Sequence, residues 1–173
     1  FQQLIQRHEA LRTRFLERDG QALQRIEPAS AFALQHLDLT QFPISERDTQ
    51  ATQAREQEAH TPFDLQNGPL LRVTLVRLDD QEHQLWVTLH HIIADGWSLN
   101  VLIDEFSRLY AAASQGQTLA LAPLPLHYAD YAQWQRQWLA AGEAARQLAY
   151  WTEQLGDEHP TLALATDHPR GAL

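Results

Sequence analysis

The chain has 173 residues, enough for one domain with a hydrophobic core or for part of a larger domain. It contains no cysteine, which excludes a disulfide framework and a thiolate metal site. The formal net charge of −9 argues against nucleic-acid binding, because that binding depends on a basic surface. No apolar run is long enough to cross a membrane.

The first elements expected along the chain are a helix, a hairpin and a third strand. Apolar residues recur at helical spacing over residues 1–11, which predicts a helix. Residues 12–26 predict two strands joined at Asp19 and Gly20, a dipeptide typical of tight hairpin turns. Residues 32–39 predict another strand.

A polar helix and a second hairpin are expected next. The helix is predicted from Pro43 to about residue 59, with Ser45 as its cap, because Pro fits a first helical turn and Ser accepts hydrogen bonds from free N–H groups. Residues 70–78 and 84–90 flank a short polar turn, which predicts an antiparallel hairpin.

The rest of the chain is predicted to be helical. Apolar residues at helical spacing over 99–110 mark a helix capped by Ser98 and ended near Gly116. Two further helices are predicted at 128–141 and 143–155. Because most strands precede the helices, the fold class is α+β, with a mixed or antiparallel sheet flanked by helices.

The stretch T-L-H-H-I-I-A-D-G-W-S-L, residues 88–99, places two histidines and an aspartate where a strand ends. If the strand continues to His91, the two imidazoles point to opposite faces. Asp95 and Gly96 then form a turn before the N-terminus of a helix, which offers free N–H groups. An imidazole, a carboxylate and free N–H groups can together move a proton and stabilise negative charge on a carbonyl oxygen. The same residues could also form a polar turn with a purely structural role.

A metal site is the other chemistry open to this turn, since His and Asp ligate metals. Side chains of neighbouring strand residues diverge, however, and the sequence shows no second cluster of ligands. We therefore predict no metal and no directly bound cofactor.

The histidine turn resembles a family motif, and three further motifs accompany it in order. H-H-I-I-A-D-G resembles the HHxxxDG motif of the condensation domains of nonribosomal peptide synthetases and related CoA-dependent acyltransferases. R-H-E-A-L-R-T-R-F, residues 7–15, resembles RHExLRTxF, and Y-A-D-Y-A-Q-W, residues 128–134, resembles YxDYxxW. Residues 150–155 and A-T-D-H-P-R near the end resemble the segment that closes the N-terminal half, with Ala165 and His168 departing from the usual P-T-D-R-P-R.

This resemblance implies a two-lobed fold. Each lobe resembles chloramphenicol acetyltransferase, and the reactive histidine lies in a tunnel between the lobes. Residues 1–173 would then form the N-terminal lobe, with the start of the domain and the C-terminal lobe missing. We expect an isolated chain of this extent to be inactive, because half of the tunnel would be absent.

The resemblance also implies an activity and its partners. Condensation domains join a donor acyl or peptidyl thioester to the amine of an acceptor aminoacyl thioester, in secondary-metabolite and antibiotic biosynthesis. Both substrates hang from phosphopantetheine arms of carrier proteins. The expected partners are therefore the upstream and downstream peptidyl carrier domains, an adjacent adenylation domain and the chain's own C-terminal lobe, in a cytoplasmic setting without nucleic acid or membrane.

The motifs also imply residue roles. The second motif histidine, His91, is the reactive one, and His90 is expected to support the turn. Asp95 corresponds to a structural aspartate that pairs with an arginine, for which Arg7 and Arg12 are the candidates and Arg12 is favoured.

Three neighbours complete the expected site. Gly96 either lies near the reacting carbonyl or is a plain turn glycine. Trp97 is expected to pack in the core, and Ser98 to cap the following helix rather than act as a nucleophile.

Three further functions remain open beside amide formation. An epimerisation domain has a similar histidine motif, and an ester-forming acyltransferase would use a hydroxyl acceptor. A non-catalytic docking module that recruits partner proteins belongs to another class, and the intact histidine motif argues against it because such modules generally have degraded motifs.

Overall fold

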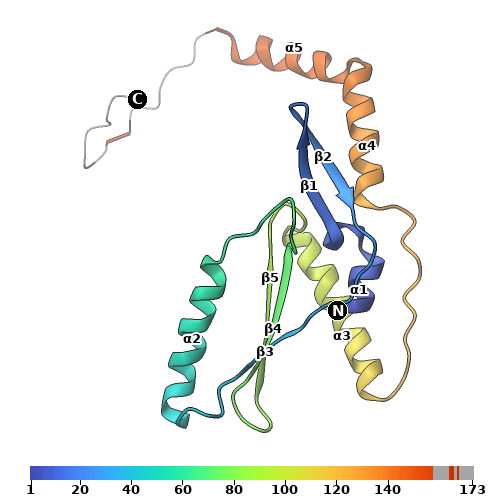
Figure 1. Cartoon of the computed structure of the whole chain (residues 1–173). Coiled ribbons are helices and arrows are strands. Elements are labelled where there is room, and N and C mark those ends of the chain that lie inside the picture. The colour runs from blue at the N-terminus through green and yellow to red at the C-terminus, as the bar shows by residue number, and fades with distance from the viewer. Residues whose placement is uncertain (158–163, 166, 168–173) are drawn as a thin grey trace. The chain divides into compact units, whose positions relative to one another are not determined.

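The computed structural model (Figure 1) describes residues 1–157, 164, 165 and 167. The chain divides into two compact units, Phe1–Asp130 and Tyr131–Leu173. His168 and most of the A-T-D-H-P-R stretch lie outside the described residues. None of the described helices combines the length and the apolar character needed to span a membrane.

The elements follow the order expected from the sequence. In the first unit they are α1 (Gln2–Arg7), the 3₁₀ helix η1 (Glu9–Arg12), β1 (Thr13–Arg18), β2 (Gln21–Ile26), β3 (Gln35–Asp38), α2 (Ile44–His60), β4 (Leu71–Arg77), β5 (His83–Leu89) and α3 (Gly96–Ser114). Then come α4 (Tyr128–Trp138), which begins at the end of the first unit, the π-helical turn η2 (Leu139–Glu143) and α5 (Ala144–Leu155). The predicted α+β class is confirmed.

Strands β1 and β2 form the predicted hairpin. They pair antiparallel, and the turn between them places Asp19 at φ 53° and Gly20 at φ 72°. Two successive positive φ angles match the right-handed twist of the strands, and Asp-Gly accepts them at low steric cost. The hairpin is a separate two-stranded sheet that extends from η1.

The other sheet has the order β3-β4-β5 and carries the core. β4 pairs antiparallel with β5, as predicted, and parallel with β3. The central strand β4 is the most buried, and Val73 and Val76 are almost completely inaccessible to solvent. β5 ends at Leu89, so the strand stops before the two histidines.

Helices cover both faces of this sheet (Figure 1). Ala51 of α2 packs with Val76 and Leu78 on one face. Ile5 of α1 packs with Val73 on the other face, where the Phe1 ring also contacts the Phe106 ring of α3 at a tilt of 34°, with 4.8 Å between ring centroids. The alternation of side chains along β4 therefore serves two separate apolar clusters.

Two expected helix caps differ from the structure. Ser45 is the second residue of α2, which begins after Pro43 without a side-chain cap. Asp95, not Ser98, caps α3. A helix capped by Ser45 or Ser98 would begin one residue after that serine. Both helices begin earlier, α2 at Ile44 and α3 at Gly96, so each serine lies inside the first turn.

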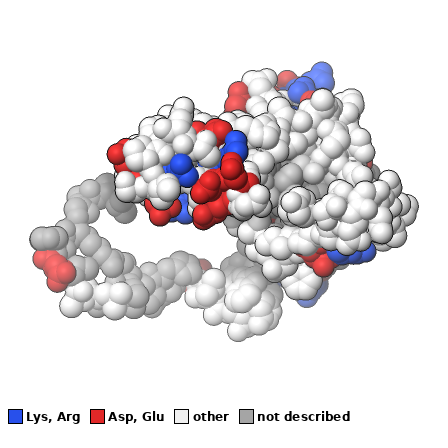
Figure 2. All heavy atoms as spheres, turned by 90° about the horizontal axis from the view of Figure 1, so that it is seen from below, with Lys and Arg blue, Asp and Glu red and all other residues white. Residues whose placement is uncertain are grey.

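Acidic and basic side chains are mixed on the surface. On the face shown in Figure 2 they lie in small groups among uncharged side chains. Ion pairs between neighbouring surface residues include Arg77 with Asp80 and Arg146 with Glu143.

Candidate active site

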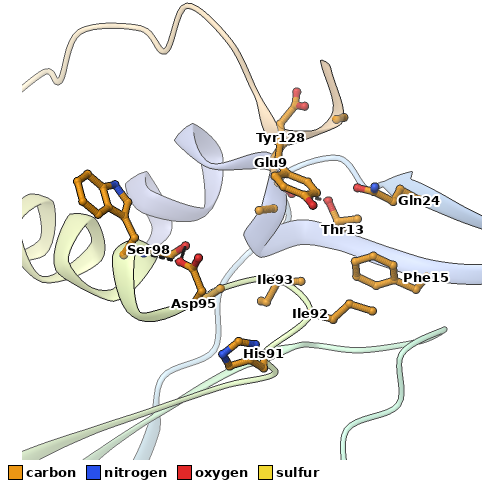
Figure 3. A pocket seen from close by; sticks show the side chains of 14 residues that line it. Glu9, Thr13, Phe15, Gln24, His91, Ile92, Ile93, Asp95, Ser98 and Tyr128 are labelled. Atoms are coloured by element: carbon orange, nitrogen blue, oxygen red, sulfur yellow. Dashed lines mark hydrogen bonds between the residues drawn. The ribbon is translucent and has the colours of Figure 1, made fainter. Parts of the chain in front are cut away.

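A pocket of about 350 Å³ lies beside the loop that joins β5 to α3 (Figure 3). One wall consists of this loop and the first turn of α3, and the other consists of η1, the β1–β2 hairpin and the start of α4. The lining residues are Glu9, Ala10, Thr13, Phe15, Gln24, His91, Ile92, Ile93, Ala94, Asp95, Trp97, Ser98, Tyr128 and Ala129.

Backbone hydrogen bonds fix the start of the loop. The N–H of His90 donates to the carbonyl of Leu70 at 3.0 Å, and the N–H of Ile93 donates back to the carbonyl of His90 at 3.1 Å. The Ile93 side chain is buried and anchors the turn. The alternation expected for a strand therefore does not set the directions of the two imidazoles, because a tight turn replaces the strand at this point.

His91 lies on the pocket wall with its side chain exposed (Figure 3). Within the part of the chain that the structure describes, its ring makes no hydrogen bond, and its nearest charged neighbour in the loop is Asp95. An exposed imidazole without a partner is free to accept a proton from a bound substrate, or to donate one.

His90 has a different environment. Its Nδ1 accepts a hydrogen bond from the N–H of Ile92 at 3.0 Å, and its ring meets the Phe63 ring edge-on at 5.7 Å. An accepting Nδ1 requires the neutral ring with its proton on Nε2. His90 thus holds the turn that carries His91, and it does not line the pocket.

Asp95 caps α3. Its Oδ1 accepts hydrogen bonds from the backbone N–H of Ser98 at 2.8 Å and from the Ser98 hydroxyl at 2.7 Å. These bonds hold the pKa of the Asp95 carboxyl below its ordinary value, the backbone N–H having the largest effect and the nearby His91 a smaller one. A helix N-terminus stabilises a carboxylate in this way because its first N–H groups have no partners within the helix.

The structure gives Arg12 and Asp95 other partners in place of the predicted ion pair. Arg12 donates from Nη1 to the carbonyl of Glu27 at 2.6 Å and contacts Glu9 at 3.4 Å. Asp95 reaches a donor only three residues away, in Ser98. A local cap needs little ordering of the chain, so it competes well against a distant arginine.

Replacing Asp95 with alanine is expected to lower the Tm by about 3 °C, because the cap of α3 is lost. Asp95→Asn keeps a capping oxygen and is expected to retain nearly the original Tm. Circular dichroism during heating measures both variants. Equal losses for Asn and Ala would indicate that the charge matters, as in an ion pair, and would contradict the capping role.

Two neighbours of Asp95 also differ from expectation. Trp97 is 80% exposed at the pocket, so the prediction that it packs in the core is wrong. It lies on the first turn of α3, where no described element covers it. Gly96 begins α3 but does not line the pocket, and a Cβ built at this position meets no atom within 4 Å.

A buried carboxylate that the sequence reasoning missed lies on α3. Glu105 is 7% exposed and accepts from Nε of Arg7 at 2.9 Å and from Nε2 of His8 at 2.6 Å. Arg7 and His8 open the early motif, so the start of this motif ties the end of α1 to α3. One signal in the sequence could have identified Glu105 as buried. This residue lies beside Phe106 on the predicted apolar face of a helix, where an acidic residue is unusual.

The pKa of Glu105 reflects two opposing effects. Burial raises it, and hydrogen bonds from His8 and Arg7, together with their charges, outweigh burial and leave it below its ordinary value. Glu105 therefore stays ionised and pairs with the two basic side chains. Among the residues that the structure describes, no group of three or more His, Asp or Glu is arranged to hold a metal ion.

Comparison with known proteins gives the family. A family model for the condensation domain matches residues 1–172. The chain is 50% identical over 170 residues to a subunit of linear gramicidin synthase from Brevibacillus parabrevis, a match that covers 98% of this chain and 2% of that subunit.

Two solved structures share the fold. The epimerization domain from the third module of tyrocidine synthetase B has a TM-score of 0.78 and 28% identity over 98% of this chain and 38% of that chain. The X-domain from teicoplanin biosynthesis, in its complex with OxyB, has a TM-score of 0.80 and 31% identity over 98% of this chain and 36% of that chain. The chain thus spans less than half of each structure and a small part of the synthase subunit. Because the family match runs through the histidine turn and over nearly the whole chain, the chain belongs to the condensation domain family of nonribosomal peptide synthetases.

Proposed function

We propose that residues 1–173 form the N-terminal lobe of a condensation domain that catalyses amide formation. The donor is an acyl or peptidyl thioester, and the acceptor is the amine of an aminoacyl thioester. Both are carried on phosphopantetheine arms, so the domain itself binds no cofactor. Its partners are upstream and downstream peptidyl carrier domains, an adenylation domain and the C-terminal lobe, in the cytoplasm.

The observation that carries this proposal is the His91 imidazole, which is exposed in the pocket and makes no hydrogen bond to any other described residue. An acceptor amine is mostly protonated near neutral pH and must lose a proton before or during attack on the thioester carbon. The N–C bond forms, the C–S bond breaks, and the pantetheine thiol leaves. His91 either takes the amine proton or holds the amine in line by a hydrogen bond.

The other residues of the turn have supporting roles in this proposal. His90 keeps the turn closed, and Asp95 fixes the start of α3. The N–H of Gly96 belongs to the first turn of that helix, where backbone donors are free. Because Gly96 does not line the pocket, the turn-glycine role is the one we propose for it.

The proposal is tested by combining the complete condensation domain with donor and acceptor carriers loaded with defined aminoacyl groups. We expect a new peptide on the acceptor carrier, detected by mass spectrometry of the pantetheine-bound product. Inversion of the donor α-carbon without a new bond would assign the chain to epimerisation, to which the tyrocidine synthetase domain gives a structural precedent. Ester formation with a hydroxyl acceptor would indicate an ester-forming acyltransferase, and carrier binding without turnover would indicate a docking module.

A further inference from the structure

Arg72 connects the sheet to the segment that follows α2. It lies on β4, where its side chain is 12% exposed. Its Nε donates to the Glu58 carboxylate at 2.6 Å, and Nη2 donates to the carbonyls of Glu58 and Thr61 at 3.2 and 2.9 Å. A single guanidinium therefore holds the last turn of α2 and the start of the next loop.

The same guanidinium holds an aromatic ring. Its Cζ lies 3.8 Å from the centroid of the Phe63 ring, a cation–π contact. The Phe63 ring in turn meets the His90 imidazole edge-on, with centroids 5.7 Å apart and an interplanar angle of 88°. Phe63 thus touches both the arginine and the first histidine of the turn.

The contacts continue into the reactive turn. His90 Nδ1 accepts a hydrogen bond from the N–H of Ile92. His91 lies between these two residues in the chain, so the bond fixes the backbone on both sides of it. A shift of the His90 ring would release the Ile92 N–H and change the direction of the His91 side chain. Displacements of this kind, of about 1 Å, reduce rates strongly because the reacting atoms lose alignment.

We propose that Arg72 is a positioning residue for His91 and acts through Phe63 and His90. This inference rests on the proposed function, since it assigns His91 the reactive role. Arg72 does not line the pocket, so its effect on the reaction would pass through other residues.

The chain offers a matched control in Arg47, near the other end of α2. Arg47 donates to three carbonyls, those of Phe42, Leu78 and Thr40, and its side chain is 16% exposed. Arg72 likewise donates to three carbonyls, because its Nη1 also reaches that of Pro62 at 3.4 Å. Unlike Arg72, Arg47 contacts neither Phe63 nor His90. If Arg72 only stabilised the fold, replacement of either arginine would have the same effect on the reaction.

The test compares Arg72→Gln with Arg47→Gln in the complete condensation domain with its loaded carriers. We expect Arg72→Gln to lower kcat about tenfold and to change KM for the carriers less than about twofold. Arg47→Gln is expected to keep kcat within about twofold of the unchanged domain, even if it lowers the Tm as much as Arg72→Gln does. Equal kcat values for the two variants would overturn the proposal.

Phe63 provides a second variant that leaves the hydrogen bonds of Arg72 intact. Phe63→Leu is expected to lower kcat as Arg72→Gln does, and Phe63→Tyr, which keeps the ring, to restore most of it. If kcat fell in these variants only in proportion to the fall in Tm, that result would also overturn the proposal.

A readout without turnover separates this inference from the proposed function. Nitrogen-15 NMR of labelled histidines reports whether His90 carries its proton on Nε2, with His90→Gln identifying the signal. We expect a single Nε2–H tautomer in the unchanged domain and a mixture in Arg72→Gln and Phe63→Leu. An unchanged tautomer in both variants would contradict the positioning role, whether or not the domain forms amides.

Discussion

His91→Ala is expected to reduce amide formation about 10²–10⁴-fold, the usual contribution of general acid–base catalysis. The imidazole is the exposed side chain that the turn presents to the pocket. In the proposed function it accepts the amine proton or orients the amine, and alanine leaves no group for either role. The measurement is the single-turnover rate of peptide formation between loaded carriers. Because the side chain is exposed, we expect the Tm to change little.

His83 supplies the control for this experiment. It is an exposed histidine at the first position of β5, at the end of the strand away from the loop that carries His91. His83→Ala is expected to leave the rate unchanged. Near-normal turnover by His91→Ala would refute the assignment of His91 as the reactive residue.

A second substitution at the same position separates the two roles proposed for His91. His91→Asn keeps a hydrogen-bond acceptor in the pocket and cannot take up a proton near neutral pH. Substantial activity in His91→Asn would indicate that the imidazole orients the amine. Loss equal to that of His91→Ala would indicate proton transfer.

Glu105→Ala is expected to lower the free energy of unfolding by about 3 kcal/mol. Glu105 is 7% exposed, and its removal leaves Arg7 and His8 without their shared carboxylate between α1 and α3. Urea denaturation followed by circular dichroism measures this change. The neighbouring Asp104, whose side chain is 68% exposed beside Arg108, is the control, and Asp104→Ala is expected to change stability by less than about 0.5 kcal/mol.

The stabilisation by Glu105 is expected to depend on pH. Its pKa in the folded chain is lowered from the ordinary value of 4.5, so folding favours the ionised form. The contribution is complete above about pH 4.5 and is lost as the pH falls through the folded-state pKa. The stability difference between the unchanged chain and Glu105→Gln should therefore narrow in acid below pH 4.5, and a difference that stays constant there would contradict this account.

Local sequence patterns predicted most of the fold. Asp19-Gly20 identified the first hairpin, and two strand-like runs on either side of a short polar turn identified β4 and β5. These signals lie within a few residues of the structure that they predict, which is why they can be recognised in one sequence. The parallel pairing of β3 with β4 lies outside that range, because α2 separates the two strands.

The polar contacts of the site were harder to predict. The sequence placed His90, His91 and Asp95 in one turn, and the structure confirms that they lie in one loop. Arg7 and Glu105 are 98 positions apart, however, and no periodicity connects them. Asp95 was expected to use a distant arginine, whereas a serine three residues away satisfies it, because the helix began earlier than the apolar pattern indicated.

The attachment of α2 has a consequence for local opening of the molecule. Ala51 is the one buried side chain among the residues of this helix, and arginines near its two ends, Arg47 and Arg72, bind backbone carbonyls there. A helix held by polar contacts at its ends has little apolar surface to keep it in place once those contacts open. Its amide hydrogens should consequently exchange with deuterated solvent together, and sooner than those of β4.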